Sequence, residues 1–413
     1  MRDPETDALD LLHDLVRIDS VNPGLVPSGA GEAAIVEHLR ARLRGAGFDT
    51  TVVPAAGRTD RPSLVAVPSV PATGPATGPT VVLNGHLDTV GVDGMPAPFT
   101  PRLDGDRLFG RGAADMKGGV AAIVAAAEHL VAVGAPVRPV LALVADEEDA
   151  SLGSEAVIDA LPRLGIRPDA CLIAEPTDLA LTRSLRGFAV VRVRFAGRAA
   201  HSSQADLGVN AVTHLGRLLH AVDQRALTAN PAVRAGGGDL MVTVARGGSS
   251  PFVVPDHAEC LVEQRTTAGR SSAAALDEVR SLLDPEWHAT AELLAHRDGW
   301  RLDDTGPAAG LSRRLGAELG TGATFDAPYW MEAPLWQRLC PTLVCGPSGG
   351  GLHAVDEWVD VRQVRALTSA LIAVLSDWTP DDDWTPGDGR APGAGRTPDG
   401  VQNSDAGWRS DAD

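Results

Sequence analysis

The stretch VVLNGHLDTV, residues 81–90, decides the fold, because a short apolar strand in it ends abruptly at His86 and Asp88. In an open α/β sheet, the carboxyl ends of parallel strands border the crevice where ligands bind. His86 is therefore a candidate metal ligand, and the Asp88 carboxylate could hold the other nitrogen of its ring. A surface histidine beside a helix-capping aspartate would give the same motif, so the other strand ends must separate the two interpretations.

Two further predicted strands also end in acidic residues. The strand in ACLIAEPTD, residues 170–178, ends at Glu175 before a proline. The strand in RPVLALVADEEDASLGS, residues 138–154, is followed directly by four acids, Asp146, Glu147, Glu148 and Asp149. Adjacent carboxylates repel one another. A solvated acidic turn is one explanation, and a divalent cation that relieves the repulsion is the other.

Asp115 and His353 extend this pattern. Asp115 stands immediately before a predicted helix at 116–134, where a simple N-cap is the alternative role. His353 lies in the loop 348–357, which follows another predicted strand. The strand ends and loops thus supply two histidines, one aspartate and two or three glutamates. This set matches a hydrolytic dizinc site, because zinc binds imidazole and carboxylate and a catalytic site leaves one position open for water.

The charges of such a site would balance. Asp115, Glu148 and Glu175 carry three negative charges, two zinc ions bring four positive charges, and a bridging hydroxide brings the sum to zero. Two metals bridged by a carboxylate lie roughly 3.5–4 Å apart and can share that hydroxide as a nucleophile.

Composition narrows the class of protein. The chain has 413 residues, which predicts two domains, and 44% hydrophobic residues, which suffice for both cores. Its net charge of −18 argues against nucleic acid as a partner. The start of the chain lacks the pattern of a signal peptide, and the apolar runs are too short to span a membrane, so we expect a soluble cytoplasmic protein without membrane contact. The cysteines show no CxxC pairing and indicate neither disulfides nor a thiolate zinc site: Cys171, Cys260, Cys340 and Cys345.

The order of predicted elements indicates an α/β fold with an insertion. Helices at 7–18 and 31–45 precede the first strands, and a β-α-β-β-α-β order follows from 187, as in a ferredoxin-like unit. We therefore predict a mixed, mostly parallel sheet flanked by helices, with an inserted ferredoxin-like α+β domain. The predicted parts are a catalytic domain at 1–186 and 299–378, the inserted lid and dimerisation domain at 187–298, and a disordered tail at 379–413. A Pro/Gly loop is predicted at 71–79.

Several short motifs of the chain, taken together, are specific for one enzyme family. The chain resembles the M20 family of dinuclear zinc metallohydrolases, which includes acetylornithine deacetylase, succinyl-diaminopimelate desuccinylase, aminoacylase and a glutamate-releasing carboxypeptidase. The resemblance covers about residues 7–376. It rests on SVNP at 20–23, GHLDTV at 85–90, GRGAADMKGG at 110–119, DEE at 146–148, AEPT at 174–177, AHSS with GVNA at 200–211, GG with VPD and Arg265, and GP with LHAVDE at 352–357.

The resemblance implies a ligand for each metal position. By motif position, Asp115 would bridge two Zn²⁺ ions, for which Co²⁺ or Mn²⁺ could substitute. His86 and Glu175 would complete one zinc site, and Glu148 and His353 the other. These are the metal ligands that we predict.

The resemblance also implies roles for residues around the metals. Glu147 matches the general base, and Asp88 the carboxylate that orients His86. His201, in the inserted domain, matches a residue that stabilises the oxyanion in the partner subunit of a homodimer. Arg265 matches a lid arginine that binds the substrate carboxylate. Glu147 and Glu148 are neighbours at a strand end and point in different directions, so one can bind metal while the other faces substrate.

Departures from the family pattern affect substrate contacts. Phe252 stands where the family often has asparagine, Met331 replaces a threonine, and the loop before His353 reads SGGGL in place of a polar run. Glu175, where aminopeptidase and dipeptidase members tend to have aspartate, favours the deacylase and carboxypeptidase branch.

We therefore predict a zinc-dependent amidohydrolase that cleaves the amide bond of an N-acyl amino acid or short peptide, most like acetylornithine deacetylase, through a zinc-bridged hydroxide with Glu147 as base. The alternatives are succinyl-diaminopimelate desuccinylase, a carboxypeptidase or dipeptidase of the same family, or a non-catalytic binding protein on this fold. An unrelated Ca²⁺-binding protein is disfavoured, because two histidine ligands suit zinc better than a hard, oxygen-seeking ion.

Overall fold

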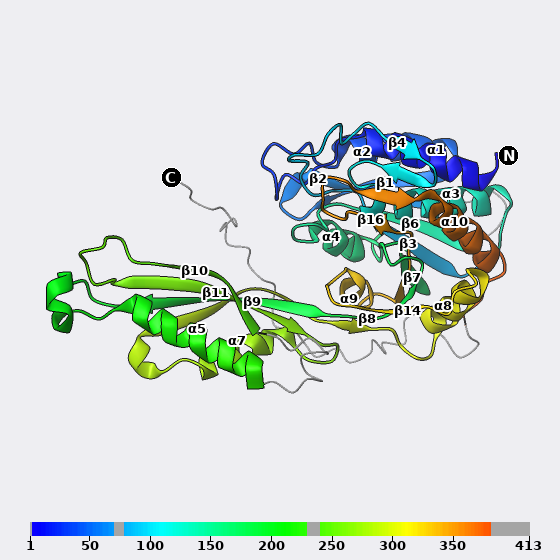
Figure 1. Cartoon of the computed structure of the whole chain (residues 1–413). Helices are drawn as coiled ribbons and strands as arrows, with labels where there is room; N and C mark the ends of the chain where they lie inside the picture. Colours follow the sequence, from blue (N-terminus) through cyan, green and yellow to red (C-terminus); the bar gives the residue numbers. More distant parts are fainter. Residues whose placement is uncertain (1, 70–77, 229–239, 381–413) are drawn as a thin grey trace. The chain divides into compact units, whose positions relative to one another are not determined.

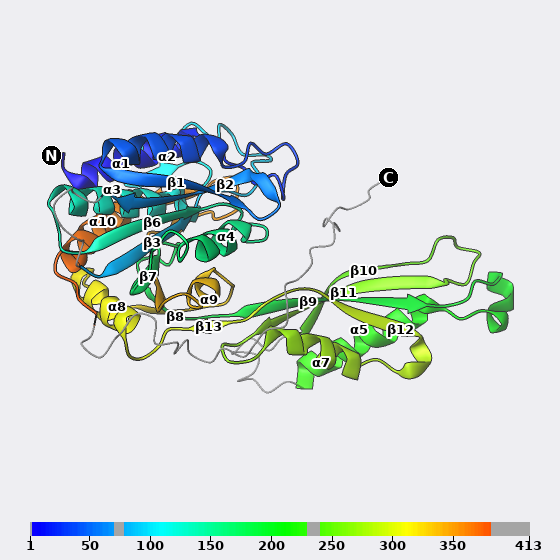
Figure 2. The ribbon, with the colours of Figure 1, turned by 180° about the vertical axis from the view of Figure 1, so that it is seen from behind.

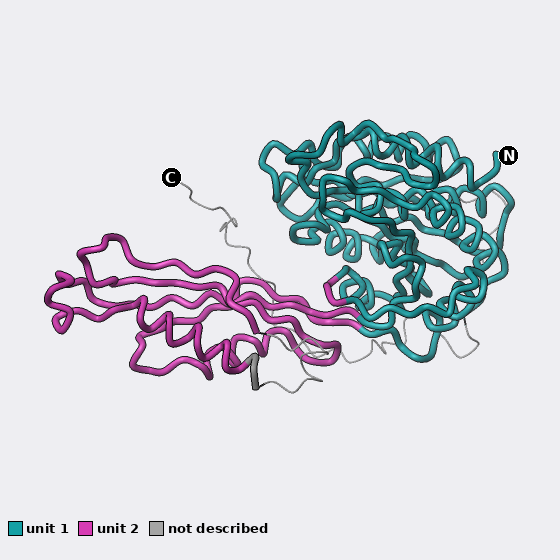
Figure 3. The backbone as a smooth tube through the Cα atoms, viewed as in Figure 1, with its two compact units in different colours: residues 1–184, 301–327, 331–391 teal, residues 185–300, 328–330, 392–413 magenta. Residues whose placement is uncertain are grey.

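A computed structural model describes residues 2–69, 78–228 and 240–380. The described chain forms two compact units (Figure 3): residues up to 184, 301–327 and from 331 make up unit 1, and residues 185–300 and 328–330 make up unit 2. The predicted inserted domain, 187–298, lies inside unit 2. Most of the predicted loop at 71–79 and of the predicted tail at 379–413 lies outside the described residues.

The described part of unit 1 contains a six-stranded sheet in the order β1-β2-β6-β3-β7-β15 (Figures 1 and 2). Strands β6, β3, β7 and β15 are parallel to one another, whereas β1 and β2 are antiparallel to their neighbours. All seven residues of β3 are buried, as expected for a central strand with both faces covered. The strands are β1 (Phe48–Ala55), β2 (Arg58–Pro68), β3 (Thr80–His86), β6 (Arg138–Val144), β7 (Ala170–Ile173) and β15 (Thr342–Val344).

Helices cover both faces of this sheet. Alternate strand residues such as Leu64, Leu83 and Leu141 share one hydrophobic core with several helices, and the intervening residues, such as Val82, are also buried. The helices of that core are α1 (Pro4–Arg17), α2 (Ala33–Gly45), α3 (Gly118–Ala132), α8 (Pro307–Glu318) and α10 (Val361–Leu375). Helix α4 (Leu152–Ala160) contacts β1, β2 and β6, and α9 (Ala333–Trp336) contacts β15.

The parallel strands bring their carboxyl ends to one edge. Strand β3 ends at His86, β6 leads into the acidic turn that starts at Asp146, and β7 leads to Glu175. Two glycines allow other segments to approach the end of β7: a Cβ atom at Gly119 or at Gly346 would lie closer than 3.0 Å to the carbonyl oxygen of Ala174. This close packing carries the start of α3, which follows Asp115, to the same edge.

Short strands complete unit 1. The segment η1 (Ala113–Lys117) contains Asp115 and joins α3. A four-stranded sheet in the order β16-β17-β5-β4 carries the loop with His353 between β16 and β17. Its strands are β4 (Arg102–Asp104), β5 (Arg107–Phe109), β16 (Gly349–Gly350) and β17 (Trp358–Asp360). Where the chain passes between the units, β8 (Leu181–Leu185) pairs with β13 (Trp300–Arg301) and β14 (Thr324–Ala327).

Unit 2 has the β-α-β-β-α-β order of a ferredoxin-like domain. Its antiparallel sheet has the order β10-β11-β9-β12, and α5 and α7 pack on it around a separate hydrophobic core (Figure 1). The elements are β9 (Gly187–Ala196), η2 (Ser202–Leu207), α5 (Ala211–Thr228), β10 (Leu240–Gly247), β11 (His257–Thr266), η3 (Ser272–Ala274), α7 (Ala275–Ser281), η4 (Pro285–Trp287) and β12 (Ala289–Arg297).

The predicted fold class is confirmed. The central sheet is mixed and mostly parallel with helices on both faces, and the inserted segment forms an antiparallel α+β unit. Among the described helices, none has both the length and the apolar character needed to cross a membrane.

Candidate metal centre

Asp115 lies between two histidines. Its Oδ1 is 3.0 Å from Nε2 of His86, and its Oδ2 is 3.2 Å from Nε2 of His353. His86 comes from the end of β3 and is 1% exposed, whereas His353 comes from the β16–β17 loop and is largely exposed. Each carboxylate oxygen of Asp115 therefore faces a different imidazole, as a carboxylate that bridges two metal ions would.

Three glutamates surround this group. Oε2 of Glu148 is 3.3 Å from Nε2 of His353, and Oε1 of Glu175 is 4.0 Å from Nε2 of His86. Within the described chain, two sets of ligand atoms lie within 4.8 Å of one another: His86, Asp115 and Glu148 form one set, and His86, Glu147 and Glu175 form the other. All five predicted metal ligands thus come together, and a carboxylate oxygen of Glu147 lies within 4.8 Å of the ligand atoms of His86 and Glu175.

The charges at this site are poorly balanced without a cation. Burial and the charge of Glu175 raise the pKa of Glu147 well above its usual value. Burial and the charge of Asp115 raise the pKa of Glu148 to about 7, and burial raises the pKa of Glu175 to about 8. Contacts with Asp115 and Glu148 raise the pKa of His353 to about 10. The carboxyls tend to hold protons and the imidazole tends to stay charged, which is the response of a crowded acidic cluster.

Asp88 organises the acidic turn. Its Oδ1 accepts a hydrogen bond from the backbone N–H of Glu147, and its Oδ2 accepts one from the backbone N–H of Glu148, both at 3.1 Å. The backbone carbonyl oxygen of Asp88 lies 3.0 Å from Nδ1 of His86, whereas the Asp88 carboxylate is 3.7 Å from that nitrogen. The main chain of Asp88 therefore makes the closer contact with the imidazole, and its side chain fixes the two glutamates.

Glu357 holds the loop that presents Asp115. Its buried carboxylate accepts hydrogen bonds from the backbone N–H groups of Gly112, Ala114 and Asp115 at 2.8–3.1 Å. It also pairs with Arg111 at 2.7 Å. A cis peptide bond follows Asp115. The role of Glu357 was not evident from the sequence, where it stands directly after Asp356 in AVDEWV.

The side chains present fit a pair of divalent cations. Oε1 of Glu148 is buried and has no hydrogen-bond partner, although an unsatisfied buried carboxylate oxygen is costly. Imidazole nitrogens and carboxylate oxygens are donors that zinc and neighbouring transition metals accept. The five predicted ligands are thus the residues that would hold the ions.

Two further buried ionisable groups, which the sequence did not predict, lie near the centre. Glu332 is 1% exposed, accepts a hydrogen bond from Oγ of Ser154 at 2.7 Å, and has its pKa raised to about 7 by burial. It follows Met331, the departure from the family pattern, which is also buried. Lys117 is fully buried two residues after Asp115, and its Nζ donates to the carbonyl oxygen of Ile18 at 2.8 Å. Glu332 is the single charge in the apolar stretch PYWMEAPLW, and this was its available signal, whereas Lys117 gave no such signal because Asp115 lies two residues before it.

The other predicted site residues, His201 and Arg265, belong to unit 2. His201 is exposed, and its Nδ1 accepts a hydrogen bond from the backbone N–H of Ser203 at 3.2 Å. Arg265, on β11, pairs with Glu263 at 2.7 Å and lies over the ring of Phe188. Phe252, where the family pattern has asparagine, is 69% exposed.

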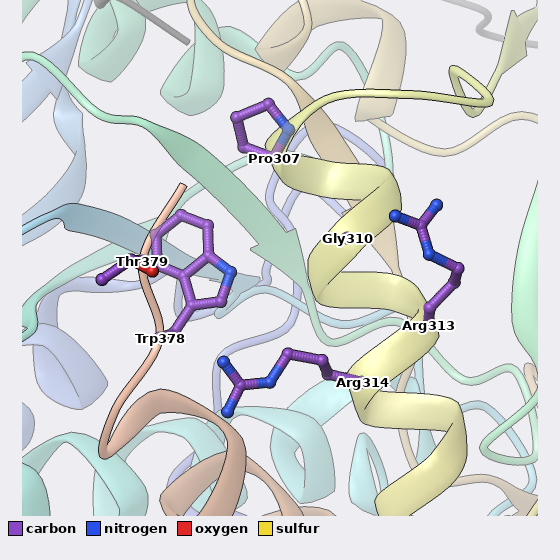
Figure 4. A pocket seen from close by; sticks show the side chains of 6 residues that line it. All are labelled: Pro307, Gly310, Arg313, Arg314, Trp378 and Thr379. Atoms are coloured by element: carbon purple, nitrogen blue, oxygen red, sulfur yellow. The ribbon is translucent and has the colours of Figure 1, made fainter. Parts of the chain in front are cut away.

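A surface pocket elsewhere in unit 1 is not lined by metal-binding side chains. It lies between α8 and the residues after α10, and Arg313 and Arg314 flank it (Figure 4). Arg314 pairs with Asp377. The lining residues, Pro307, Gly310, Arg313, Arg314, Trp378 and Thr379, include no carboxylate or imidazole.

An aspartate between two imidazoles, with glutamates around it at the carboxyl ends of parallel strands, is the site of a metal-dependent hydrolase. The family model described as peptidase family M20/M25/M40 matches residues 82–377. The chain belongs to this family, and the resemblance seen in the sequence is confirmed. It is therefore an enzyme of a family of metal-dependent peptidases and deacylases.

Two curated relatives match over most of their length. Succinyl-diaminopimelate desuccinylase from Cereibacter sphaeroides (strain ATCC 17029 / ATH 2.4.9) is 30% identical over 90% of this chain and 99% of the relative. Acetylornithine deacetylase from Vibrio vulnificus (strain CMCP6) is 28% identical over 85% of this chain and 93% of the relative. The sequence predicted that the chain is a hydrolase and that it cleaves amide bonds. Both predictions agree, at the level of the family, with the names of these relatives.

A solved structure supports the fold. The YXEP protein of Bacillus subtilis, described as a dinuclear metal binding peptidase of family M20, superposes with a TM-score of 0.62 at 16% identity, covering 90% of this chain and 98% of that one. The prediction that a metal is required is confirmed at the level of the family.

The pKa shifts predict how pH affects the metal-free protein. Glu148 and Glu175 have folded pKa values of about 7 and about 8, above the value of 4.5 that is usual for glutamate, so the folded chain binds more protons than the unfolded chain near neutral pH. His353, raised to about 10, acts in the same direction. Metal-free protein should therefore lose stability as the pH rises from about 6.5 to about 8.

Thermal unfolding in the presence of a chelator measures this slope, and zinc-loaded protein is the control. Zinc requires deprotonated carboxylates and neutral imidazoles, so the increase in Tm that zinc produces should be larger at about pH 8 than at about pH 6.5. An increase in Tm that is the same at both pH values would contradict the assignment of these residues as ligands.

Proposed function

We propose that the enzyme hydrolyses the amide bond of an N-acyl amino acid at a centre of two divalent cations, with zinc as the working metal. In this proposal Asp115 would contribute to holding both ions, His86 and Glu175 would hold one of them, and Glu148 and His353 would hold the other. The observation that carries the proposal is the position of Asp115, each of whose carboxylate oxygens faces a different buried or loop-borne imidazole.

The ions, when bound, would polarise the amide carbonyl and make a water molecule nucleophilic. The protein's own contribution begins with Glu147, which we assign as the general base. Its carboxyl is half-buried near Glu175, and its pKa is raised well above the usual value, so it can accept a proton from water and give it to the departing amine near neutral pH. Asp88 holds the backbone N–H groups of both glutamates and so fixes the direction of each side chain.

Two acyl groups are candidates for the substrate. The resemblance favours an N-acetyl amino acid, as in acetylornithine deacetylase, and Glu175 favours the deacylase and carboxypeptidase branch. The relative with 30% identity is named succinyl-diaminopimelate desuccinylase, and this favours an N-succinyl amino acid as the second candidate. In either case we assign Arg265 to the substrate carboxylate and His201 to the oxyanion.

Substitution of the neighbouring glutamates tests their separate roles. Glu147→Gln should retain both zinc ions and lower kcat by about 10²- to 10⁴-fold, because a general base is lost. Glu148→Gln should instead lose zinc, since a ligand is replaced. The exposed neighbour Asp149→Asn is the control and should change neither property. Metal analysis beside steady-state kinetics measures both, and loss of zinc from Glu147→Gln would make Glu147 a ligand.

A substrate panel tests the reaction. Hydrolysis of N-acetyl amino acids, N-succinyl amino acids and dipeptides is measured before and after chelation and after Zn²⁺, Co²⁺ or Mn²⁺ is added back. We expect cleavage of an N-acyl amino acid that disappears on chelation and returns best with zinc. Cleavage of dipeptides alone, or activity that resists chelation, would overturn the proposal.

We propose further that unit 2 is a lid and the interface of a homodimer. Its strand β10 lies at an edge of the described sheet, and exposed apolar residues lie in this unit, namely Leu207, Val212, Met241 and Phe252. Edge strands and apolar patches are favoured sites of association. Sedimentation velocity should show a dimer that Met241→Glu weakens, and a wild-type monomer at micromolar concentration would refute this.

A cytoplasmic location is supported by the four free cysteines, all of them buried.

A further inference from the structure

A buried ionic cluster lies directly behind the acidic turn. We call it the Arg61 cluster, and it consists of Asn22, Glu32, Arg61, Asp88 and Asp146. Each of these residues is at most 1% exposed. They come from different segments: the loop after α1, the start of α2, strand β2, the loop after β3 and the loop after β6. Such a concentration of buried charge is costly and needs precise pairing.

Arg61 joins two of the acids. Its Nε donates to Oε2 of Glu32 at 2.9 Å, and its Nη1 contacts Oδ1 of Asp146 at 2.6 Å. A guanidinium can hold two carboxylates through separate nitrogens in fixed directions, which an ammonium group cannot do equally well. Arg61 therefore ties the acidic turn to the start of α2.

Asn22 continues the connection to Asp88. Its Nδ2 donates to Oδ2 of Asp88 at 2.7 Å and lies 3.2 Å from Oδ1 of Asp146. Its Oδ1 accepts the backbone N–H of Gly24 at 2.8 Å, and this contact fixes which way the amide points. The amide thus lets two carboxylates lie close together, because it donates a proton to each.

The cluster ends at Glu147 and Glu148, the two neighbouring glutamates of the metal centre. Asp88 accepts the backbone N–H groups of Glu147 and Glu148 with its two oxygens. Asp146, immediately before them, has a positive φ of 71°, which is uncommon outside glycine, and its backbone oxygen accepts the N–H of Ala150 at 3.1 Å. The backbone at the turn is therefore held on both sides by acids whose own charges face Arg61 and Asn22.

We propose that Arg61, with Asn22, is a positioning residue that sets the directions of Glu147 and Glu148 and so couples the Arg61 cluster to metal binding and turnover. Neither residue touches the metal ligands with its side chain, and each acts through Asp88 or Asp146. This inference rests on the proposed function for its kinetic consequences, but its effect on metal affinity does not depend on the substrate.

The test compares full-length Arg61→Met, Arg61→Lys and Asn22→Leu with the wild type. Metal-free protein is titrated with Zn²⁺ in competition with a chromogenic chelator, and kcat and KM are measured separately. Partners that orient metal ligands typically contribute about 10- to 100-fold in affinity or activity. Arg61→Met and Asn22→Leu should therefore weaken zinc binding and lower kcat by about that factor with little change in KM, and Arg61→Lys should recover part of both losses.

Arg42→Met is the matched control. Arg42 also holds two acids: it pairs with Asp7, and its Nε donates to Oε1 of Glu128 at 2.9 Å, away from the residues of the metal centre. This variant should lower the Tm and leave zinc affinity and kcat at the wild-type level. If Arg61→Met behaves in the same way, the cluster serves stability alone and the proposal is overturned.

If Arg61→Met does not fold, the Asn22→Leu variant still tests the proposal. It removes one amide and no charge, and folded Asn22→Leu with wild-type zinc affinity and kcat would also overturn the proposal. Failure of the proposed function is distinguishable, because the wild type would then cleave no N-acyl amino acid. Weaker zinc binding in the Arg61 and Asn22 variants, without weakening in Arg42→Met, would still support positioning.

Discussion

The fold gathers several carboxyl groups at one edge of its sheet, and these groups repel one another. The rest of the site is built around this repulsion. Asp115, Glu147, Glu148 and Glu175 lie in or near the protein interior, where charge is weakly screened. Two imidazoles only partly offset them, and the raised pKa values of the glutamates express the remaining imbalance. A protein that keeps so many acids together without cations would lose stability, so the arrangement is explained by the ions that it can bind.

The geometry of the backbone brings these carboxyl groups to one edge of the sheet. Parallel strands β6, β3 and β7 end side by side, and glycines at 119 and 346 let the start of α3 and the chain after β15 pack against the end of β7. Carboxylates that bind no metal then fix the loops. Glu357 accepts three backbone N–H groups around Asp115, and Asp88 accepts those of the two neighbouring glutamates. Acids thus position other acids, which makes the centre sensitive to charges beyond its ligands.

The sequence was sufficient to predict that the five candidate ligands lie together, and which sheet carries most of them. An apolar strand followed by an acid or histidine is a local pattern, and the parallel topology brings such strand ends together. The ferredoxin-like order of unit 2 was also readable from the alternation of strands and helices. Two residues that we expected in the site, His201 and Arg265, belong to unit 2, and their roles remain proposals.

The supporting residues could not be predicted in the same way. Asn22, Arg61 and Glu357 act through contacts with residues far away in the chain, and no local pattern specifies such partners. The contact of His86 with the backbone carbonyl of Asp88, in place of its carboxylate, depends on main-chain geometry that the sequence does not specify. Only the fold reveals which groups these side chains face.

The most direct test of this account is a crystal structure of the zinc-loaded enzyme with anomalous diffraction data recorded at the zinc absorption edge. The account predicts two peaks roughly 3.5–4 Å apart, one on each side of the Asp115 carboxylate. One peak would be coordinated by His86 and Glu175, and the other by Glu148 and His353. A single zinc ion, or two ions that do not share Asp115, would contradict it.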